Sequence, residues 1–148
     1  MDVVDKDTRS RMMSGIRARN TKPEILIRSL LHASGVRFRL HVNSLPGKPD
    51  IVLPKYKAVV FVHGCFWHGH GCHLFKWPAT RPEFWRTKIE RNRANDDKAV
   101  ATLAAAGWRI AIVWECAIRS SAKTDCEGLR LALLGWLKGD GSRLELRE

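Results

Sequence analysis

The 148-residue sequence contains no apolar run of the roughly 18 residues that a membrane-spanning helix needs. Its opening segment, MDVVDKDTRSRMMSG, also lacks the apolar stretch of a secretory signal. We find no internal repeat, no low-complexity tract and no linker rich in proline, glycine or serine. These absences argue against a membrane protein and a repeat protein, and they predict one intracellular domain spanning residues 1–148.

Acidic residues are few. The chain has 15 Asp and Glu against 26 Lys and Arg, a formal net charge of +11, and its pI is about 10.1. Such an excess of positive charge favours a polyanion as partner. Residues 1–20 form a polar, basic N-terminal arm with Arg9, Arg11, Arg17 and Arg19. This arm is either a solvated tail or a segment that follows phosphates along a nucleic acid.

Capping patterns and apolar periodicity predict an α/β fold, with a mixed β-sheet flanked by helices. Three helices begin at capping boxes, and their N-caps and N3 acids are Thr21 with Glu24, Thr80 with Glu83, and Thr124 with Glu127. We expect these helices to end at Gly35, at Gly107 after Ala106, and at Leu137, respectively. Strands are expected at residues 36–42, 51–54, 57–62 and 108–114, which gives the order α-β-β-β-α-β-α.

Residues 63–73, HGCFWHGHGCH, place cysteine and histidine at spacings suited to zinc. Cys65 and Cys72 lie seven residues apart in a glycine-containing loop, and Cys116 follows the strand at 108–114. One histidine would complete a closed Cys₃His site, and His70 fits that place better than His68 or His73 because it lies inside the loop. We therefore predict a structural zinc site.

Other interpretations of the four cysteines stay open. In a secreted chain they could form two disulfides, and a core thiol pair with surface histidines is also compatible with the pattern. Cys126 lies in the first turn of the last predicted helix and is expected to be a small structural residue. Because a closed zinc site has no position for a catalytic water, any chemistry should lie beside it.

A carboxylate lies where a nuclease could use one. Asp50 begins a predicted strand, and a carboxylate at such a bend can bind Mg²⁺. Many nucleases carry Glu-x-Lys on the partner strand, but Phe61 and His63 stand at these positions here. Asp50 could alternatively only cap a turn. With His63 and His68 nearby as proton acceptors or donors, the group indicates phosphodiester hydrolysis.

Three segments make the sequence resemble the very-short-patch-repair (Vsr) endonucleases, which nick DNA at T:G mismatches. They are SLPGKPDIVLPKY, VVFVHGCFWHGHGCHLFKWPATRPEFWRTKIERNRANDDK and LAAAGWRIAIVWECAIR. With TRSRMMSGIRARNTKPE near the N-terminus, the resemblance covers roughly residues 5–137. It implies a restriction-endonuclease-like fold.

The resemblance also implies roles for individual residues. Asp50 and the backbone carbonyl of Val62 would bind the catalytic Mg²⁺, and His68 would be the general base. His63 and Glu24 would complete the catalytic site, although Glu24 is also the N3 residue of a capping box. The implied zinc ligands are Cys65, His70, Cys72 and Cys116. The implied DNA-binding residues are the aromatic wedge Phe66, Trp67 and Trp85, together with Lys88 and Asp96, and Trp85 could alternatively be a core residue.

The function implied is Mg²⁺-dependent nicking of duplex DNA 5′ of the T in a T:G mismatch, which starts repair of deaminated 5-methylcytosine. The partners implied are a cytosine-5 DNA methyltransferase, mismatch-repair proteins and a repair DNA polymerase, and the enzyme would be a monomer at the bacterial nucleoid in the cytoplasm. Two alternatives remain open. One is a restriction-like or selfish-element endonuclease that needs no mismatch, and the other is a zinc-containing DNA-binding protein without catalysis.

Overall fold

A five-stranded mixed sheet forms the centre of the computed structural model, which describes residues 21–121 and 126–147. β1 (Arg39–Leu40), β2 (Ile51–Leu53) and β3 (Ala58–His63) are antiparallel neighbours. β4 (Arg109–Trp114) lies parallel to β3, and β5 (Arg143–Leu146) lies parallel to β4. The predicted α/β class and mixed sheet are confirmed.

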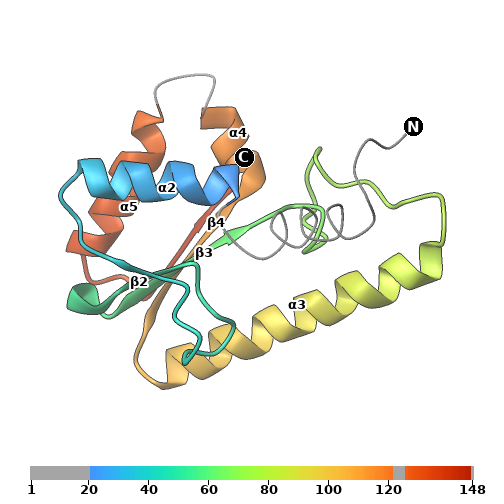
Figure 1. Ribbon diagram of the computed structural model, residues 1–148, viewed down its shortest axis with the longest axis horizontal. Helices are drawn as coiled ribbons and strands as arrows, with labels where there is room; N and C mark the ends of the chain where they lie inside the picture. Colours follow the sequence, from blue (N-terminus) through green and yellow to red (C-terminus); the bar gives the residue numbers. More distant parts are fainter. Residues whose placement is uncertain (1–20, 122–125, 148) are drawn as a thin grey trace, which may run out of the picture.

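Helices cover both faces of this sheet (Figure 1). α2 (Lys22–Ala33), α4 (Glu115–Ser121) and α5 (Glu127–Lys138) lie on one face, and α3 (Pro82–Ala105) crosses the other. A short 3₁₀ helix, η1 (Pro54–Tyr56), joins β2 to β3. The N-terminal end of α3 extends well beyond the sheet.

Each face of the sheet has its own hydrophobic core. Val60 packs with Ile27 of α2 and Leu133 of α5, whereas its neighbour Val59 packs with Leu103 of α3 on the other side. This alternation follows from the strand geometry, which turns successive side chains to opposite faces. It also explains why the central strands are almost wholly apolar: a strand buried on both faces needs apolar residues at every position.

The first predicted capping box is confirmed for its Thr half. Thr21 is the N-cap of α2, and its Oγ1 accepts a hydrogen bond from the backbone N–H of Glu24 at 3.4 Å. Gly35 follows this helix with φ +78°, the left-handed conformation that commonly ends helices. The chain turns before β2 at Gly47, which has φ +74° and where a side chain would collide with Ala99 of α3.

The strand expected at residues 36–42 was too long. Only Arg39 and Leu40 pair with β2, and both are exposed. His41 has φ +51°, which breaks the extended conformation directly after Leu40. The segment lies at the edge of the sheet, where one side has no partner strand to hold it.

The prediction that Thr80 caps the long helix was wrong. The N-cap of α3 is Arg81, with φ +53° and no side-chain capping bond, and Pro82 is the first helical residue. The Arg81 guanidinium lies 4.3 Å from the ring centroid of Phe84, so this residue contacts the first turn through a cation–π interaction. The other end is as expected, since the helix stops at Ala105 and Gly107 has φ +88°.

The C-terminal region contains two elements that the sequence did not predict, α4 and β5. The capping residue Thr124 lies outside the described residues, and the N-cap of α5 is Cys126, with φ +62°. β5 escaped prediction because it is four residues long and half polar, and it gains strand structure only by pairing with β4. The predicted basic arm, residues 1–20, also lies outside the described residues.

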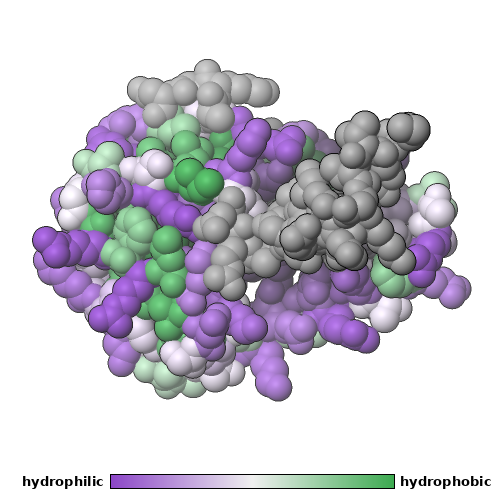
Figure 2. All heavy atoms as spheres, in the orientation of Figure 1, coloured by the Kyte–Doolittle hydropathy of each residue, from purple (hydrophilic) through white to green (hydrophobic). Residues whose placement is uncertain are grey.

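Among the residues described, no helix combines the length and apolar character needed to cross a membrane. Hydrophilic side chains instead line the edge of the molecule along which α3 runs (Figure 2). Most residues of α3 are exposed, and only Ile89, Ala99 and Leu103 are fully buried.

Candidate active site and metal cluster

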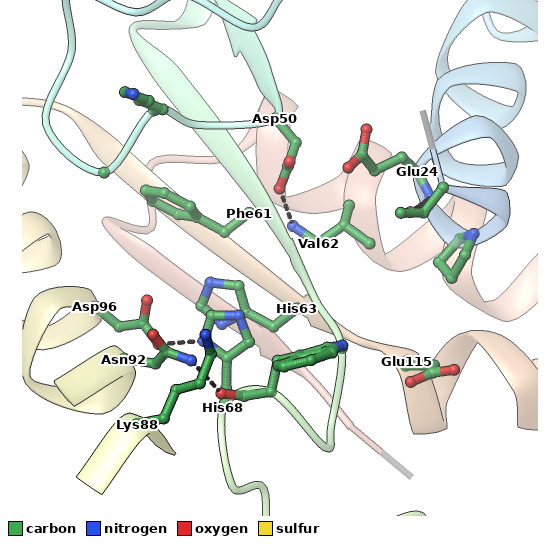
Figure 3. A pocket seen from close by; sticks show the side chains of 16 residues that line it. Glu24, Asp50, Phe61, Val62, His63, His68, Lys88, Asn92, Asp96 and Glu115 are labelled. Atoms are coloured by element: carbon green, nitrogen blue, oxygen red, sulfur yellow. Dashed lines mark hydrogen bonds and ion pairs between the residues drawn. The ribbon is translucent and has the colours of Figure 1, made fainter. Parts of the chain in front are cut away.

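A pocket of about 550 Å³ collects most of the predicted catalytic residues (Figure 3). Glu24 of α2, Asp50 directly before β2, and His63 at the end of β3 line it together with His68 and Asp96. These residues come from four separate regions of the chain. The carboxylates and the histidines that the sequence suggested are therefore brought together in one place.

Asp50 is held in this pocket by the neighbouring strand. The backbone N–H of Val62 donates a hydrogen bond to Asp50 Oδ2 at 2.7 Å. Asp50 lies one residue before β2, where the strand pairing directs β3 backbone groups toward it. The pKa of Asp50 is raised to about 7, chiefly by burial and in part by the nearby Glu24, whereas the Val62 hydrogen bond and Arg28 act in the opposite direction.

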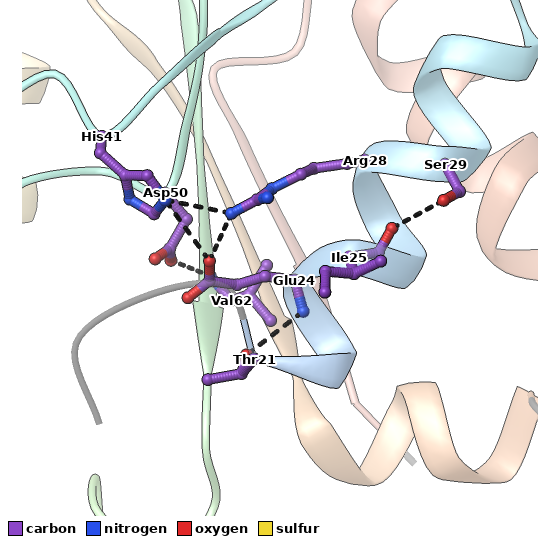
Figure 4. A network of polar contacts seen from close by, with 8 residues as sticks. All are labelled: Thr21, Glu24, Ile25, Arg28, Ser29, His41, Asp50 and Val62. Carbon is purple, nitrogen blue, oxygen red and sulfur yellow. Dashed lines mark hydrogen bonds and ion pairs between the residues drawn. The ribbon is translucent and has the colours of Figure 1, made fainter. Parts of the chain in front are cut away.

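Glu24 faces Asp50 within a buried polar network (Figure 4). Its carboxylate accepts a hydrogen bond from Arg28 at 2.9 Å and lies 3.9 Å from Nε2 of His41. Arg28 also contacts His41 Nε2 at 3.0 Å. Glu24 is 4% exposed, and ligand atoms of Glu24, His41 and Asp50 all lie within 4.8 Å of one another. Glu24 thus caps α2 with its backbone while its carboxylate enters the pocket.

Two carboxylates so close together suit a divalent cation. Mg²⁺ takes oxygen ligands and keeps several waters, and its charge relieves the repulsion between neighbouring carboxylates. Asp50 and Glu24 supply oxygens at the wall of a pocket that has room for water and a phosphate. The residues present therefore fit this ion.

His68 forms a pair with Asp96 across the pocket from Asp50. Its Nδ1 contacts Asp96 Oδ2, although the two residues belong to different segments of the chain. A carboxylate at Nδ1 fixes the tautomer of a neutral imidazole so that Nε2 carries the free lone pair. The sequence suggested Asp96 only as a residue of the DNA-contacting helix, and the structure places it against the proposed base.

His63 lies beneath His68. The two rings are stacked, with centroids 3.9 Å apart and an interplanar angle of 7°. His63 is buried, and burial lowers its pKa to about 3, assisted by the charges of His68 and His70. It is therefore neutral near neutral pH.

A second cluster contains the four residues predicted to bind zinc. Ligand atoms of Cys65, His70, Cys72 and Cys116 all lie within 4.8 Å of one another. His70 Nδ1 lies 3.6 Å from Cys116 Sγ, and the Cys116 backbone N–H donates to Cys65 Sγ at 3.3 Å. Cys116 reaches the cluster because α4 begins directly after β4 and buries this side chain beside the loop.

The chemistry of these donors fits zinc. None of the four cysteines forms a disulfide in this structure. Burial raises the pKa of the Cys65 thiol well above its usual range, and a cation is needed to stabilise its thiolate. Three sulfurs and one imidazole form the closed Cys₃His set typical of structural sites. Cys126 lies apart from the cluster and is buried at the start of α5, as expected.

The three aromatic residues of the predicted wedge form one group. Phe66 lies 5.2 Å from Trp67 and 5.3 Å from Trp85, measured between ring centroids. All three side chains are half-buried, so Trp85 is not a core residue. Lys88 extends from α3 over the Trp67 ring, with Nζ 6.0 Å from its centroid. A cluster of this kind beside the pocket offers apolar faces for stacking on bases.

Sequence reasoning missed several residues of the site, namely Arg28, His41, Asn92 and Glu115. A signal existed for one of them, since Lys88, Asn92 and Asp96 are spaced four residues apart on a helix and must share a face. No such signal exists for His41, which enters the site through an irregular backbone conformation after β1.

Comparisons with known proteins identify the family of the chain. Residues 1–74 match the family described as DNA mismatch endonuclease Vsr. The chain is 47% identical over 145 residues to the DNA mismatch endonuclease Vsr of Escherichia coli K12, which covers 98% of this chain and 93% of that protein. The chain belongs to the Vsr family.

Nicking enzymes are also among the relatives of this Vsr-family chain. It is 53% identical over 115 residues to the type II nicking enzyme V.XorIIP of Xanthomonas oryzae pv. oryzae, covering 78% of this chain and 85% of that protein. The type II nicking enzyme V.NmeAIP of Neisseria meningitidis is 42% identical over 121 residues, with coverage of 82% and 86%. The protein is accordingly a DNA endonuclease of the nicking type, and the non-catalytic alternative is set aside.

Proposed function

We propose that this Vsr-family endonuclease uses Mg²⁺ to nick duplex DNA 5′ of the T in a T:G mismatch. The observation that carries the proposal is the pocket in which Asp50 and the His68–Asp96 pair lie on opposite walls. A metal-binding carboxylate and a general base on two sides of one phosphate are the parts that metal-assisted hydrolysis requires. The shared family name, DNA mismatch endonuclease, supports the mismatch as substrate.

Each residue has a defined task in this mechanism. Asp50 and the backbone carbonyl of Val62, with Glu24 nearby, would hold Mg²⁺, which would supply positive charge at the scissile phosphate. His68 accepts a proton at Nε2 from the attacking water, while Asp96 holds the Nδ1–H and stabilises the resulting imidazolium. His63 stays neutral because it is buried, and it supports His68 by stacking.

The Val62 carbonyl is a reasonable ligand on backbone grounds. In an antiparallel strand, the N–H and C=O of one residue point to the same edge. Because the Val62 N–H is directed at Asp50, its carbonyl lies on the same side of β3. This arrangement supports a role for Val62 that does not depend on the chemistry of its side chain.

We propose that zinc occupies the Cys₃His cluster and stabilises the loop that carries both the wedge and the base. Cys65 and His70 bracket the segment that contains Phe66, Trp67 and His68. Zinc binding at both ends would fix this short segment, and it would contribute to folding because the loop contains few aliphatic residues. The reaction itself takes place in the adjacent pocket.

The aromatic wedge would recognise the mismatch by stacking. Inserting side chains between base pairs costs a few kcal/mol of unstacking, and this cost is least at a mismatch. Stacking on aromatic rings returns about 1–3 kcal/mol per base. Phe66, Trp67 and Trp85 would therefore insert more readily at T:G than at a matched pair, and Lys88 beside Trp67 would add a contact to the DNA.

We propose a monomeric enzyme on a restriction-endonuclease-like scaffold, acting at the bacterial nucleoid in the cytoplasm. Deaminated 5-methylcytosine produces T:G pairs, so a cytosine-5 DNA methyltransferase would generate its substrate. Mismatch-repair proteins and a repair DNA polymerase would act with it or after it. The bacterial origin of the relatives supports this setting.

A comparison of three duplexes tests the substrate. They share one sequence and differ only in T:G, T:A or C:G at the central pair, with each strand labelled at a different end. We expect one nick, 5′ of the mismatched T, in the presence of Mg²⁺. Equal cutting of the matched duplexes, or cutting of both strands, would support the restriction-like alternative instead.

A further inference from the structure

Helix α3 holds the segment Trp67–Gly69 through every backbone carbonyl of these three residues. Asn92 Nδ2 donates a hydrogen bond to the carbonyl of Trp67 at 2.8 Å. Arg93 Nε donates to the carbonyl of His68 at 3.1 Å, and Arg93 Nη2 donates to the carbonyl of Gly69. Carbonyls of a loop are usually solvated, so three successive bonds from one helix mark a dedicated contact.

The same helix also holds the side chains of this segment. Asp96 contacts the His68 imidazole, and Lys88 lies over the Trp67 ring. Lys88, Asn92 and Asp96 are spaced four residues apart, so they lie along one face of α3. Arg93 follows Asn92 in the helix and bonds to the carbonyls of His68 and Gly69. Backbone and side chains of the segment are therefore held by a single rigid element.

Gly69 allows the guanidinium to approach the loop this closely. Its φ is +59°, and a β-carbon there would lie 2.9 Å from Arg93 Nε and 2.6 Å from Ile89 Cγ2. Only glycine combines this backbone conformation with such a close contact. The backbone at Gly69 is thus matched to the side chain of Arg93.

The segment joins two parts with different tasks. Trp67 belongs to the aromatic group beside the pocket, and the next residue, His68, is paired with Asp96 inside the pocket. One peptide unit separates them. A displacement of the Trp67 backbone therefore moves His68, unless the segment bends between the two residues.

We propose that Arg93, assisted by Asn92, is a positioning residue that couples insertion of the wedge to placement of His68. By fixing the carbonyls of residues 67–69, Arg93 makes the wedge and the base one rigid unit. Seating of the aromatic residues in DNA then places His68 Nε2 at the scissile phosphate. This inference rests on the proposed roles of Trp67 and His68.

Arg93 could alternatively contribute only as a DNA-binding cation. The two roles predict different measurements. A phosphate contact supplies binding free energy, and its loss weakens affinity and lowers the salt dependence of binding by about one counterion. A positioning role leaves affinity in place and acts on the chemical step, because a misplacement of about 1 Å can cost about 100-fold in rate.

The test uses Arg93→Ala and Arg93→Lys, with Lys98→Ala as the control that removes one positive charge from the same helix. Lys98 is exposed and lies outside the pocket. We would measure single-turnover nicking at saturating enzyme, the Kd at several salt concentrations, and the fluorescence of 2-aminopurine beside the mismatch, which reports base unstacking. Zinc content and thermal unfolding of each variant verify the fold.

For Arg93→Ala we expect nicking about 10- to 100-fold slower, with a Kd within about threefold of wild type, an unchanged salt slope and full 2-aminopurine signal. Arg93→Lys should recover part of the rate, since an ammonium can donate to one of the two carbonyls. Asn92→Ala should reduce the rate less. If Arg93→Ala fails to fold, the saturated nicking rate and the Kd of Arg93→Lys are compared with those of Lys98→Ala. A slower rate at an unchanged Kd in Arg93→Lys alone then supports the positioning role.

A weaker Kd and a smaller salt slope at an unchanged saturated rate would overturn the inference, and so would a full rate in both Arg93 variants. Failure of the proposed function looks different, because the wild-type enzyme itself would then show no preference for T:G. In that case the same comparison is made on the duplex that the wild-type enzyme nicks. On that duplex, a saturated nicking rate that falls in Arg93→Ala still supports the positioning role.

Discussion

His68 and Asp96 are joined through Nδ1 and Oδ2, so a carboxylate from the middle of α3 orients the imidazole at the pocket wall. We expect Asp96→Asn to lower the saturated nicking rate by about 100-fold or more, because an amide neither selects the required tautomer nor stabilises the imidazolium. Affinity for DNA should change little.

The matched control for Asp96 is its neighbour Asp97, which is exposed. Asp97→Asn removes the same charge one residue away and should retain the wild-type rate. Equal losses in the two variants would mean that the charge of α3 matters, rather than the contact with His68. Single-turnover kinetics at saturating enzyme makes this distinction.

Asp50 should reduce the stability of the metal-free protein above neutral pH. Its pKa is about 7 when folded against a model value of 3.8, so the folded state holds the proton more tightly. Stability attributable to this group is therefore fully present below pH 3.8 and is lost as pH rises to about 7. Asp50→Asn should be more stable than wild type at pH 8 by up to about 4 kcal/mol.

Urea unfolding without added Mg²⁺ measures this difference, with zinc left in place. Adding Mg²⁺ should stabilise the wild-type protein and leave Asp50→Asn unaffected, because the ion binds only the folded carboxylate. A variant less stable than wild type at pH 8 would contradict the assignment of Asp50 as a buried, unfavourably placed carboxylate.

His63 should make the protein sensitive to acid. Its pKa is lowered from 6.5 to about 3 by burial, so the unfolded chain takes up the proton first as pH falls. Stability due to this group is thus complete above pH 6.5 and declines below it by up to about 1.4 kcal/mol per pH unit. His63→Asn should show a shallower decline between pH 6.5 and 5. Zinc content must stay constant at each pH for the comparison to hold. The same decline of stability with pH in His63→Asn and in wild type would contradict this prediction.

Zinc should depend on Cys116 and not on Cys126. Cys116→Ser removes a ligand, and we expect less than one zinc per chain and a free energy of unfolding lower by about 3 kcal/mol or more. Cys126→Ser is the matched control, since this thiol donates to the Ser121 carbonyl and lies outside the cluster. Metal analysis with thermal unfolding tests both. Full zinc content in Cys116→Ser would exclude Cys116 as a ligand.

The sequence predicted the parts of this structure that depend on local signals. The cap at Thr21 and the buried central strands followed from spacing and periodicity, and the Cys₃His cluster followed from the cysteine and histidine pattern. These features need only the neighbouring residues to be recognised.

Contacts between distant segments were not predictable in this way. The pairing of His68 with Asp96 requires α3 to lie against the loop, and the entry of His41 depends on a left-handed residue after β1. β5 is a strand only because β4 offers it a partner. The wrong cap at Thr80 has a similar cause, since Pro82 and the Arg81–Phe84 contact fix the start of α3 instead.

The most direct test of the central claim compares the wild-type enzyme with Asp50→Ala on one T:G duplex. Nicking and binding are measured side by side in Mg²⁺, with zinc content as the check on folding. We predict that Asp50→Ala binds the mismatch with near wild-type affinity and retains zinc, yet nicks at least about 1,000-fold more slowly, because a metal-binding carboxylate supplies several kcal/mol of barrier lowering. Nicking by Asp50→Ala at the wild-type rate would contradict the account.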